Sequence, residues 1–468
     1  MRSGPDTRRS LATLLLALAV LLVLISAVAA EQPGPGSPAP AGRLAQPRGE
    51  EGCIHARGIN RCASGRAVSS PEELAVSPDG RHVYVASLGS HAVAVFARDR
   101  RTGDLKQLRG RRGCVRLGRS RSCTPARALA RPVSIAISPD GGSVYVAAAA
   151  SDALAIFRRN PRTGALRQLR GARGCISRRP GGGCLLGRAL NEPTSVAVSP
   201  DGMRVYVAGR RFPSGIAVLA RASDGSLTQG AGTDGCVSQG GRSGCGAVRG
   251  MSAPEEVAVT PDSRYVVVAG SRSNAVAVLR HGPSGLSQPE GEAGCIATGA
   301  AEGCASGRAL RGPVDLAITA DGREVYVASS ISDGIAVLHR NRGTGALTQS
   351  RGRAGCISQG GGRGRCADGR ALDEVWGVAV SRDGRNVYAV SAKVNTLAAL
   401  ARDESSGTLA QLPGRYGCFI RAGGFGCPDG RGLTVAVAVT VSPDGRNVYA
   451  ASEDAYLGAI AVFRRRLG

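Results

Sequence analysis

One unit of about 61 residues occurs seven times along the chain, and this repetition limits the fold more than any other feature. Seven cysteine pairs mark the units: Cys53 with Cys62, Cys114 with Cys123, Cys175 with Cys184, Cys236 with Cys245, Cys295 with Cys304, Cys356 with Cys366, and Cys418 with Cys427. A second marker, an aspartate that opens an Asp-Gly or Asp-Ser turn, keeps the same interval at Asp79, Asp140, Asp201, Asp262, Asp321, Asp383 and Asp444. Self-similarity at a fixed interval indicates a repeat architecture, in which each unit packs on its neighbours.

Each unit has the pattern of a small antiparallel sheet. In residues 193–235, four runs rich in Val, Ala, Leu and Thr lie at 194–199, 203–209, 215–221 and 226–229. Short runs of this kind, bounded by turns such as Pro200-Asp201-Gly202, are typical of strands. We therefore predict a four-stranded antiparallel meander per unit, followed by an excursion that its cysteine pair closes. Aromatic residues make up only 3% of the chain, so small aliphatic side chains must fill the core.

Seven such sheets can bury both of their faces if they are arranged radially, which predicts an all-β, closed seven-bladed β-propeller. The seventh unit stops after its third strand, at 460–465. The N-terminal segment 42–49 (GRLAQPRG) matches the fourth strand of the second unit, 164–171 (GALRQLRG), at five of eight positions. We predict that 42–49 completes the last blade, and that residues 42–468 are a single domain.

Local sequence in the second strands resembles a known repeat family. Residues 77–87 (SPDGRHVYVAS), with similar stretches at 138–148, 199–209 and 442–452, resemble the Tyr-Val-Thr-Asn (YVTN) repeat proteins and the lactonase-like seven-bladed propellers. The resemblance covers nearly the whole chain after its N-terminal segment and implies the propeller fold. Members of this group include hydrolases of sugar lactones and many propellers with no assigned chemistry, so the resemblance leaves both classes of function open.

The N-terminus has the pattern of an export signal. Residues 1–10 carry three arginines, 11–30 are largely apolar, and the segment ends in Ala-Val-Ala-Ala. This predicts a signal peptide over 1–30, with an uncleaved membrane anchor as the alternative. Residues 31–41 (EQPGPGSPAPA) are predicted to be a Pro/Gly-rich linker. We expect a monomer that is secreted or held at the cell envelope, and that contacts the membrane only if this segment is retained.

Export also determines how the cysteines are interpreted. An even, locally paired count in an exported chain predicts seven disulfides, one within each pair. Zinc sites use shorter Cys-x2–4-Cys spacings with further ligands, which are not found here. All seven pairs connect an outer strand to the next inner strand, so we expect the bridged loops to project from one face of the ring.

The formal net charge is +25, and almost all of the basic residues are arginines. The excursions of the first two complete units carry the candidate ligand-binding arginines Arg111, Arg112, Arg116, Arg119, Arg121, Arg178 and Arg179. Segment 290–303 instead carries three glutamates and no arginine. An anionic cell-envelope polymer is the partner that this asymmetry favours, and a solvated basic surface is the alternative. Sequence-specific nucleic-acid binding is not expected, because the chain is exported and has few aromatic residues for base stacking.

A column of inner-strand positions supplies the candidate catalytic residues. Where lactonase-like relatives often carry a histidine, the column here is Glu73, Ser134, Ser195, Glu256, Asp315, Gly377 and Ala438. The carboxylates of Glu73, Glu256 and Asp315 should converge near the channel mouth, where they could act as a general base or bind Ca²⁺. The alternative is that they pair with arginine or face water. Trp376 lies one position away and could stack on a sugar ring or serve packing.

The remaining repeated residues are interpreted as structural. Tyrosines recur on the second strand at Tyr84, Tyr145, Tyr206, Tyr326, Tyr388 and Tyr449, as inter-blade packing requires, and the Asp-Gly pairs are interpreted as turns. No nucleophile elbow, zinc-protease helix or phosphate-binding motif occurs. Besides the polymer, an unidentified protein or small molecule remains a possible partner. The sequence favours an exported, disulfide-stapled binding or scaffolding module. A lactonase-type hydrolase of a sugar lactone or related ester is the alternative, and no cofactor other than Ca²⁺ is suggested.

Overall fold

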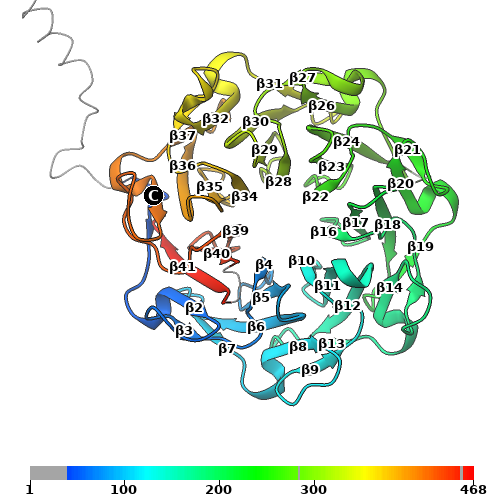
Figure 1. The fold of residues 1–468 in the computed structure, drawn as a ribbon. Coiled ribbons are helices and arrows are strands. Elements are labelled where there is room, and N and C mark those ends of the chain that lie inside the picture. Colours follow the sequence, from blue (N-terminus) through cyan, green and yellow to red (C-terminus); the bar gives the residue numbers. More distant parts are fainter. Residues whose placement is uncertain (1–39, 283–284, 454–456, 468) are drawn as a thin grey trace, which may run out of the picture. The chain divides into compact units, whose positions relative to one another are not determined.

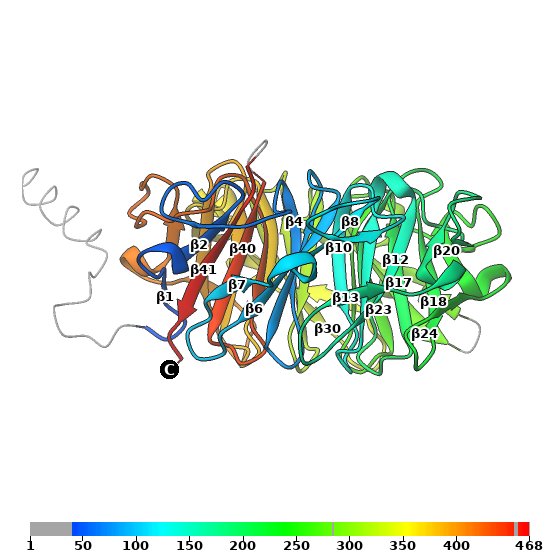
Figure 2. The ribbon, with the colours of Figure 1, turned by 90° about the horizontal axis from the view of Figure 1, so that it is seen from below.

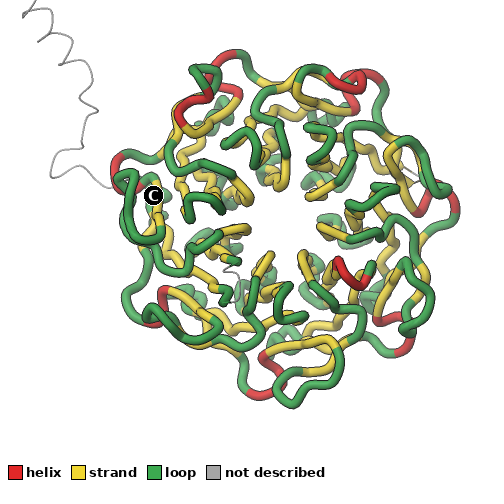
Figure 3. The backbone as a smooth tube through the Cα atoms, viewed as in Figure 1, coloured by secondary structure: helices red, strands yellow, loops and turns green. Residues whose placement is uncertain are grey.

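The computed structural model describes residues 40–282, 285–453 and 457–467. The predicted signal peptide (1–30) and almost all of the predicted linker (31–41) lie outside these residues. Residues Ala41–Gly468 form one compact unit. In the part of the chain that is described, strands dominate and helix occurs only as short 3-10 turns (Figure 3). Within that part, no helix is long and apolar enough to cross a bilayer.

Seven sheets surround a central axis, which confirms the predicted seven-bladed propeller (Figure 1). Blade one comprises β4 (Pro71–Val76), β5 (His82–Ser87), β6 (Ala92–Arg98), β7 (Leu105–Gln107), β8 (Cys114–Leu117) and β9 (Thr124–Ala126). Blade two comprises β10 (Pro132–Ile137), β11 (Ser143–Ala148), β12 (Ala153–Arg159), β13 (Leu166–Gln168), β14 (Cys175–Ser177) and β15 (Leu185–Leu186). Blade three comprises β16 (Pro193–Val198), β17 (Arg204–Gly209), β18 (Gly215–Arg221), β19 (Leu227–Gln229), β20 (Cys236–Gln239) and β21 (Gly246–Val248).

The other blades follow the same plan. Blade four comprises β22 (Pro254–Val259), β23 (Tyr265–Gly270), β24 (Ala275–Gly282), β25 (Gly285–Ser287), β26 (Cys295–Thr298) and β27 (Ala305–Gly307). Blade five comprises β28 (Pro313–Ile318), β29 (Glu324–Ser329), β30 (Gly334–Arg340), β31 (Leu347–Gln349), β32 (Cys356–Gln359) and β33 (Ala367–Gly369). Blade six comprises β34 (Val375–Val380), β35 (Asn386–Ser391), β36 (Thr396–Arg402), β37 (Leu409–Gln411) and β38 (Cys418–Ile420). Blade seven comprises β39 (Ala436–Val441), β40 (Asn447–Ser452) and β41 (Ala459–Arg465), with β1 (Leu44–Ala45), β2 (Cys53–His55) and β3 (Ala63–Ser64).

The 3-10 turns lie between strands. They are η1 (Glu50–Gly52), η2 (Gly110–Gly113), η3 (Ala149–Ser151), η4 (Gly171–Gly174), η5 (Gly232–Gly235), η6 (Gly291–Gly294), η7 (Ala301–Gly303), η8 (Gly352–Gly355), η9 (Gly360–Gly362) and η10 (Gly414–Tyr416). Most of them divide the fourth strand of a blade. In blade one, η2 separates β7 from β8, and both halves pair antiparallel with β6.

The blades contain more strand than the predicted four-stranded meander. In six of the seven blades a short extra strand, directly after the second cysteine of the pair, pairs parallel to the outer half-strand, as β9 does with β8 through Val115 opposite Thr124. The meander is therefore extended at its outer edge by a segment of the excursion itself. The bridged loops lie at this outer edge of the blades (Figure 1).

All seven predicted disulfides are confirmed, each within its own local pair. They join Cys53 to Cys62, Cys114 to Cys123, Cys175 to Cys184, Cys236 to Cys245, Cys295 to Cys304, Cys356 to Cys366, and Cys418 to Cys427. The described residues include no free cysteine. Seven disulfides indicate an oxidising, extracytoplasmic environment.

The two ends of the chain meet in blade seven, as predicted from the match of 42–49. Strand β1 pairs antiparallel with β41 through Leu44 opposite Arg465, and β2 pairs with β41 through Ile54 opposite Ile460 (Figure 2). The Tyr388 hydroxyl on blade six donates to the carbonyl of Gly42 at 2.8 Å. The ring is therefore closed by strands from both termini.

Hydrophobic clusters fill the spaces between neighbouring blades. The Tyr84 ring of blade one, for example, packs with Val144 and Phe157 of blade two. All six predicted tyrosines are fully buried, as expected. In blade four, where Val267 interrupts the series, Tyr265 is buried instead and its hydroxyl donates to a carbonyl in the next blade.

The Asp-Gly turns do more than reverse the chain. A buried arginine at the end of a third strand binds the turn aspartate and the tyrosine of the preceding blade. At the junction of blades one and seven, Arg98 donates from Nη2 to Asp444 at 2.9 Å and from Nε to the Tyr449 hydroxyl at 2.8 Å. Arg159, Arg221 and Arg465 make the same two contacts at their own junctions. The other junctions vary: Arg340 binds the turn aspartate Asp262 alone, Arg402 binds Tyr326 and Glu324, and His281 of blade four contacts Tyr206. We call these contacts the turn clasps.

A second set of inter-blade contacts uses a glutamine and an arginine at the outer rim. Gln107 of blade one accepts the N–H of Arg66 at 2.9 Å and donates to the Arg66 carbonyl at 2.8 Å. The Arg66 guanidinium in turn donates to the carbonyl of Gly110 in η2. The equivalent arginines are Arg127, Arg188, Arg249, Arg308, Arg370 and Arg431. Across these two sets, thirteen arginines of the described chain therefore take part in contacts between blades.

Candidate ligand site at the mouth of the central channel

A backbone irregularity at the start of each inner strand determines which side chains face the axis. All seven inner strands carry a bulge near their first residue, between Pro71 and Glu73 in blade one. In a bulge two residues oppose one on the partner strand, so side-chain alternation fails locally. Two consecutive residues, Glu72 and Glu73, consequently line the axial cavity, as do Glu255 and Glu256 in blade four.

The cavity on the axis has a volume of about 680 Å³ and takes lining residues from all seven blades. Its mouth is strongly acidic. The acidic lining residues are Glu72, Glu73, Glu192, Glu255, Glu256, Asp315 and Glu453. Deeper in the channel the wall is aliphatic, from residues such as Ile318, Val380 and Val441. A molecule that enters from this face meets carboxyl groups first.

The structure brings Glu73, Glu256 and Asp315 together on the wall of this cavity, half-buried. Two of the three carboxylates also bind the backbone of another blade. Glu73 Oε2 accepts the N–H of Ile135 at 2.8 Å, and Asp315 Oδ2 accepts that of Val378 at 2.7 Å. These bonds give Glu73 and Asp315 a structural role alongside any chemical one.

Serines at the same column position bind in the same way. Ser134 Oγ accepts the N–H of Val196 at 3.0 Å, and Ser195 Oγ accepts that of Val257 at 3.2 Å. Glu256 lacks a corresponding bond to blade five, because the Leu316 N–H donates to Asp315 instead, at 2.7 Å. Glu256 is therefore the acid of the column that is least engaged by the neighbouring blade.

The three carboxyls do not all ionise near neutral pH. Burial raises the pKa of Glu73 to about 7, against hydrogen bonds from Ser134 and Ile135 that lower it. Burial also raises the pKa of Asp315 to about 7. Burial and repulsion from Asp315 and Glu73 raise the pKa of Glu256 well above its ordinary value. Near neutral pH these three coupled carboxyls are therefore partly protonated. The cluster can then both donate and accept hydrogen bonds.

An outer group of charges surrounds this cluster. Glu192 accepts a hydrogen bond from Arg210, which holds the pKa of that carboxyl below its usual range. Burial raises the pKa of Glu72 to about 7, with repulsion from Glu453 acting in the same direction. Arg131 opposes this second shift. The mouth thus mixes ionised and protonated acids with two arginines.

Trp376 lies at the same mouth, with 39% of its surface exposed. Its indole N–H donates to Glu374 at 3.2 Å. The exposed ring face is compatible with stacking on a ligand, which stays a prediction. In the described residues, no group of three or more His, Cys, Asp or Glu side chains has the arrangement of a metal site. Ca²⁺ therefore gains no support from this geometry.

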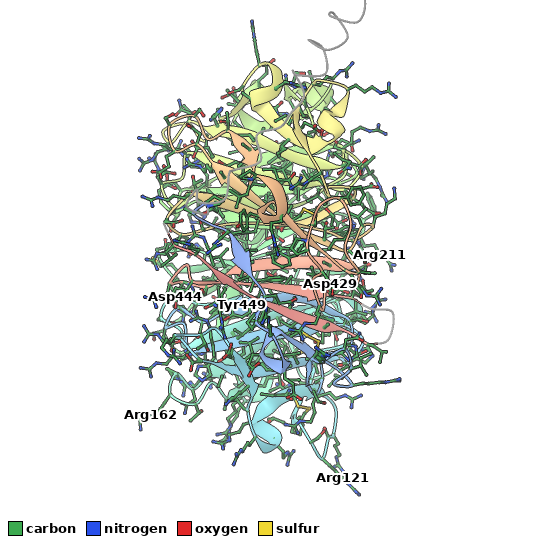
Figure 4. The ribbon with its side chains drawn as sticks, turned by 90° about the vertical axis from the view of Figure 1, so that its left-hand side faces the viewer. Arg121, Arg162, Arg211, Asp429, Asp444 and Tyr449 are labelled. Atoms are coloured by element: carbon green, nitrogen blue, oxygen red, sulfur yellow. A yellow bond between two sulfur atoms is a disulfide. The ribbon has the colours of Figure 1, made fainter. Side chains whose placement is uncertain are left out.

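The seven candidate arginines lie apart from the channel, on the exposed loops of blades one and two. Two of them are engaged: Arg179 forms an ion pair with Asp152 at 2.7 Å, and Arg111 donates to the Cys123 carbonyl at 3.2 Å. The other five, which form no ion pair within the described chain, are Arg112, Arg116, Arg119, Arg121 and Arg178. Arg121 lies on the same face of the ring as Arg211, which pairs with the mouth residue Glu192, whereas Arg162 and Asp444 lie on the other face (Figure 4).

Sequence reasoning missed the outer acids Glu72, Glu192, Glu255 and Glu453 and the arginines Arg131 and Arg210. A signal for two of them exists. Pro71-Glu72-Glu73 and Pro254-Glu255-Glu256 place consecutive acids in a strand, which strict alternation would send to opposite faces. Glu192 and Glu453 come from loops, where periodicity carries no information.

Comparison with solved structures identifies proteins with the same fold. No family model and no curated protein matches the chain. Among solved structures, the periplasmic gluconolactonase of Pseudomonas aeruginosa superposes with a TM-score of 0.50 at 20% identity, over 77% of this chain and 85% of that one. Hydrazine synthase of Kuenenia stuttgartiensis gives 0.52 at 16% identity, over 88% and 99%.

A protein of Desulfotomaculum acetoxidans, whose function is unknown, gives a TM-score of 0.51 at 14% identity, over 79% of this chain and 88% of that one. At such identities the likeness shows a shared fold and no shared chemistry. The neighbours do include a lactonase, as the resemblance to lactonase-like propellers implied.

Proposed function

We propose that this protein is an exported binding module whose axial cavity holds a small, neutral, hydroxyl-rich molecule. The observation that carries the proposal is the convergence of Glu73, Glu256 and Asp315 on a cavity of about 680 Å³. A protonated carboxyl donates a hydrogen bond and an ionised one accepts it. Together they can bind hydroxyl groups, each of which both donates and accepts hydrogen bonds. A cavity of this size lies within the range of about 300–1,000 Å³ that is typical of small-molecule sites.

Isothermal titration with neutral sugars, cyclic polyols and sugar lactones tests this proposal. We expect Glu256→Gln to weaken the binding of a hit at least tenfold, because a carboxyl that can change its protonation state becomes a fixed amide. The control is Glu290→Gln. Glu290 is an exposed acid just before η6, outside the cavity, and this variant should bind the hit as tightly as the wild type. A wild-type protein that binds no member of the panel would contradict the proposed function.

Hydrolysis of a lactone is the second candidate, and the position of Glu256 favours it. Burial and the neighbouring carboxyls Asp315 and Glu73 raise the pKa of Glu256 well above its ordinary value, and no backbone N–H of blade five binds it, so this carboxyl is the candidate for proton transfer to or from a lactone. The gluconolactonase among the structural neighbours raises this possibility by analogy of fold. Acid release from the lactones, followed in a pH-stat, separates the candidates. Turnover that disappears in Glu256→Gln would identify a hydrolase, whereas binding without turnover would support the binding module.

We further propose that the protein is held at the cell envelope through its exposed arginines. Arg116, Arg119 and Arg121 lie within the disulfide loop Cys114–Cys123, and Arg112 lies in η2 just before it. In the described chain no carboxylate is paired to any of the four. The partner we propose is an acidic envelope polysaccharide. Attraction of this kind acts through exposed charges, so salt should weaken it strongly.

Retention on immobilised polygalacturonate tests the arginine loop. We expect the wild type to bind, and replacement of these four arginines by glutamine to reduce the slope of log affinity against log salt by roughly three to four. The matched control replaces Arg81, Arg100, Arg101 and Arg162, which are exposed in the turn regions of the same two blades. Equal losses in both variants would show only a general effect of net charge and would refute a specific surface.

A further inference from the structure

The inner strand is the edge of each sheet that faces the channel, so half of its backbone N–H groups point into the cavity. In blade one, the N–H of Ser77 donates to His82, which makes Ser77 and His82 a hydrogen-bonded pair. Such pairs alternate with pairs that are not hydrogen-bonded to each other. Leu74, opposite Val85, falls at one of the latter positions. Its N–H is directed away from β5, into the channel.

One N–H group of each blade occupies this position, which makes seven. Side chains from the inner-strand column that contains Glu73, Ser134 and Asp315 accept hydrogen bonds from five of them. The capped donors are Ile135, Val196, Val257, Leu316 and Val378, which bind Glu73, Ser134, Ser195 and, for the last two, Asp315. The donors left over are Leu74 in blade one and Val439 in blade seven. Within the described residues, neither N–H has a protein acceptor, and both residues line the cavity.

The sequence explains why these two N–H groups stay open. The side chain that would cap Leu74 belongs to Ala438, and the one that would cap Val439 belongs to Gly377, so neither position offers an oxygen. At Gly377 a Cβ atom would lie 2.9 Å from Val390 Cγ2 and 3.0 Å from the Val437 carbonyl oxygen. Close packing between blades six and seven therefore excludes a capping side chain at Gly377.

The cavity is consequently asymmetric. Blades seven and one present open backbone donors, and blades one, four and five present the carboxyls Glu73, Glu256 and Asp315. We propose that the N–H groups of Leu74 and Val439 bind the carbonyl and ring oxygens of the ligand, while its hydroxyls contact the carboxyls. This inference rests on the proposed channel ligand and narrows its class to neutral, hydroxyl-rich molecules that carry a carbonyl.

The serines of the column supply the test variant. In Ala438→Ser, the new hydroxyl occupies the place that Ser134 and Ser195 occupy in their blades, and should cap Leu74 within the protein. The probe is D-galactono-1,4-lactone, compared with 1,4-anhydro-D-galactitol, which lacks the carbonyl. We expect the wild type to prefer the lactone at least tenfold, and Ala438→Ser to remove that preference while it still binds the anhydroalditol.

A control variant completes the design. Ala438→Gly leaves Leu74 open and should retain the preference for the lactone. Hydrogen exchange of the peptide over residues 71–76 gives a readout without any ligand, because Ala438→Ser should slow exchange of the Leu74 amide. An unchanged preference in a variant whose Leu74 amide is protected would overturn the inference and leave the channel ligand standing. A wild type that binds neither probe would overturn both.

Discussion

Removing residues 1–57, so that the chain begins at Gly58, is expected to lower the free energy of unfolding by roughly 5–10 kcal/mol. The change deletes β1 and β2 from blade seven, and with them the buried side chains of Leu44 and Ile54. It also deletes Gln46, which exchanges hydrogen bonds with the backbone of Arg431 at 2.8 and 2.9 Å. Several hydrogen bonds at about 1 kcal/mol each and two buried side chains at about 2 kcal/mol each give the estimate.

Differential scanning calorimetry and size-exclusion chromatography measure this loss. Aggregation should accompany it, because β41 becomes an exposed hydrophobic edge. A chain that starts at Pro40 should unfold like the complete one. The double substitution Cys53→Ser with Cys62→Ser, in the intact chain, isolates the contribution of the disulfide. A truncated chain as stable as the one that starts at Pro40 would contradict the role of the N-terminal strands in closing the ring.

Arg98→Leu is expected to cost about 3 kcal/mol of unfolding free energy. The Arg98 side chain is completely buried at the junction of blades one and seven, whereas its partner Asp444 is 26% exposed. Removal of one member of a buried pair leaves the other uncompensated, at a typical cost of about 3–5 kcal/mol. Because Asp444 can be hydrated in part, we expect the lower end of this range.

Arg464→Leu is the matched control for the same junction. Arg464 of blade seven pairs with Asp104 of blade one at 3.1 Å, but its side chain is 47% exposed. Exposed pairs typically contribute at most about 1 kcal/mol, so this variant should unfold almost like the wild type. Equal destabilisation of both variants in urea titrations would show that burial does not distinguish the two contacts.

The architecture was predictable because its signals repeat. The cysteine pairs and the Asp-Gly turns fix the number of blades, and the match of 42–49 to 164–171 locates the missing strand. The short parallel strand that follows the disulfide loop in six blades was missed, since a segment such as Thr124–Ala126 is too short to show any periodicity. Tyr265 was missed as a core residue because it is displaced by two positions from the tyrosine column.

The candidate site was predictable only where it follows the column. Glu73, Glu256 and Asp315 share a repeat position, so a ring necessarily brings them to one channel. The bulge that adds Glu72 and Glu255 is a backbone feature with no residue type of its own. The inter-blade roles of Arg98 and Arg66 were not predicted for a related reason: composition counts charges and does not show which arginines contact a neighbouring blade. Only the structure distinguishes these from exposed arginines such as Arg121.

Closure of the ring by both ends of the chain sets the order of events in biosynthesis. The residues that pair with Leu44 and Ile54 lie in β41, which is synthesised after all the other strands of the ring. Strands β1 and β2 must therefore stay unpaired until β41 has been made. A product whose synthesis stops early cannot complete its final blade, so quality-control proteases could distinguish it from the finished protein by an edge that stays open.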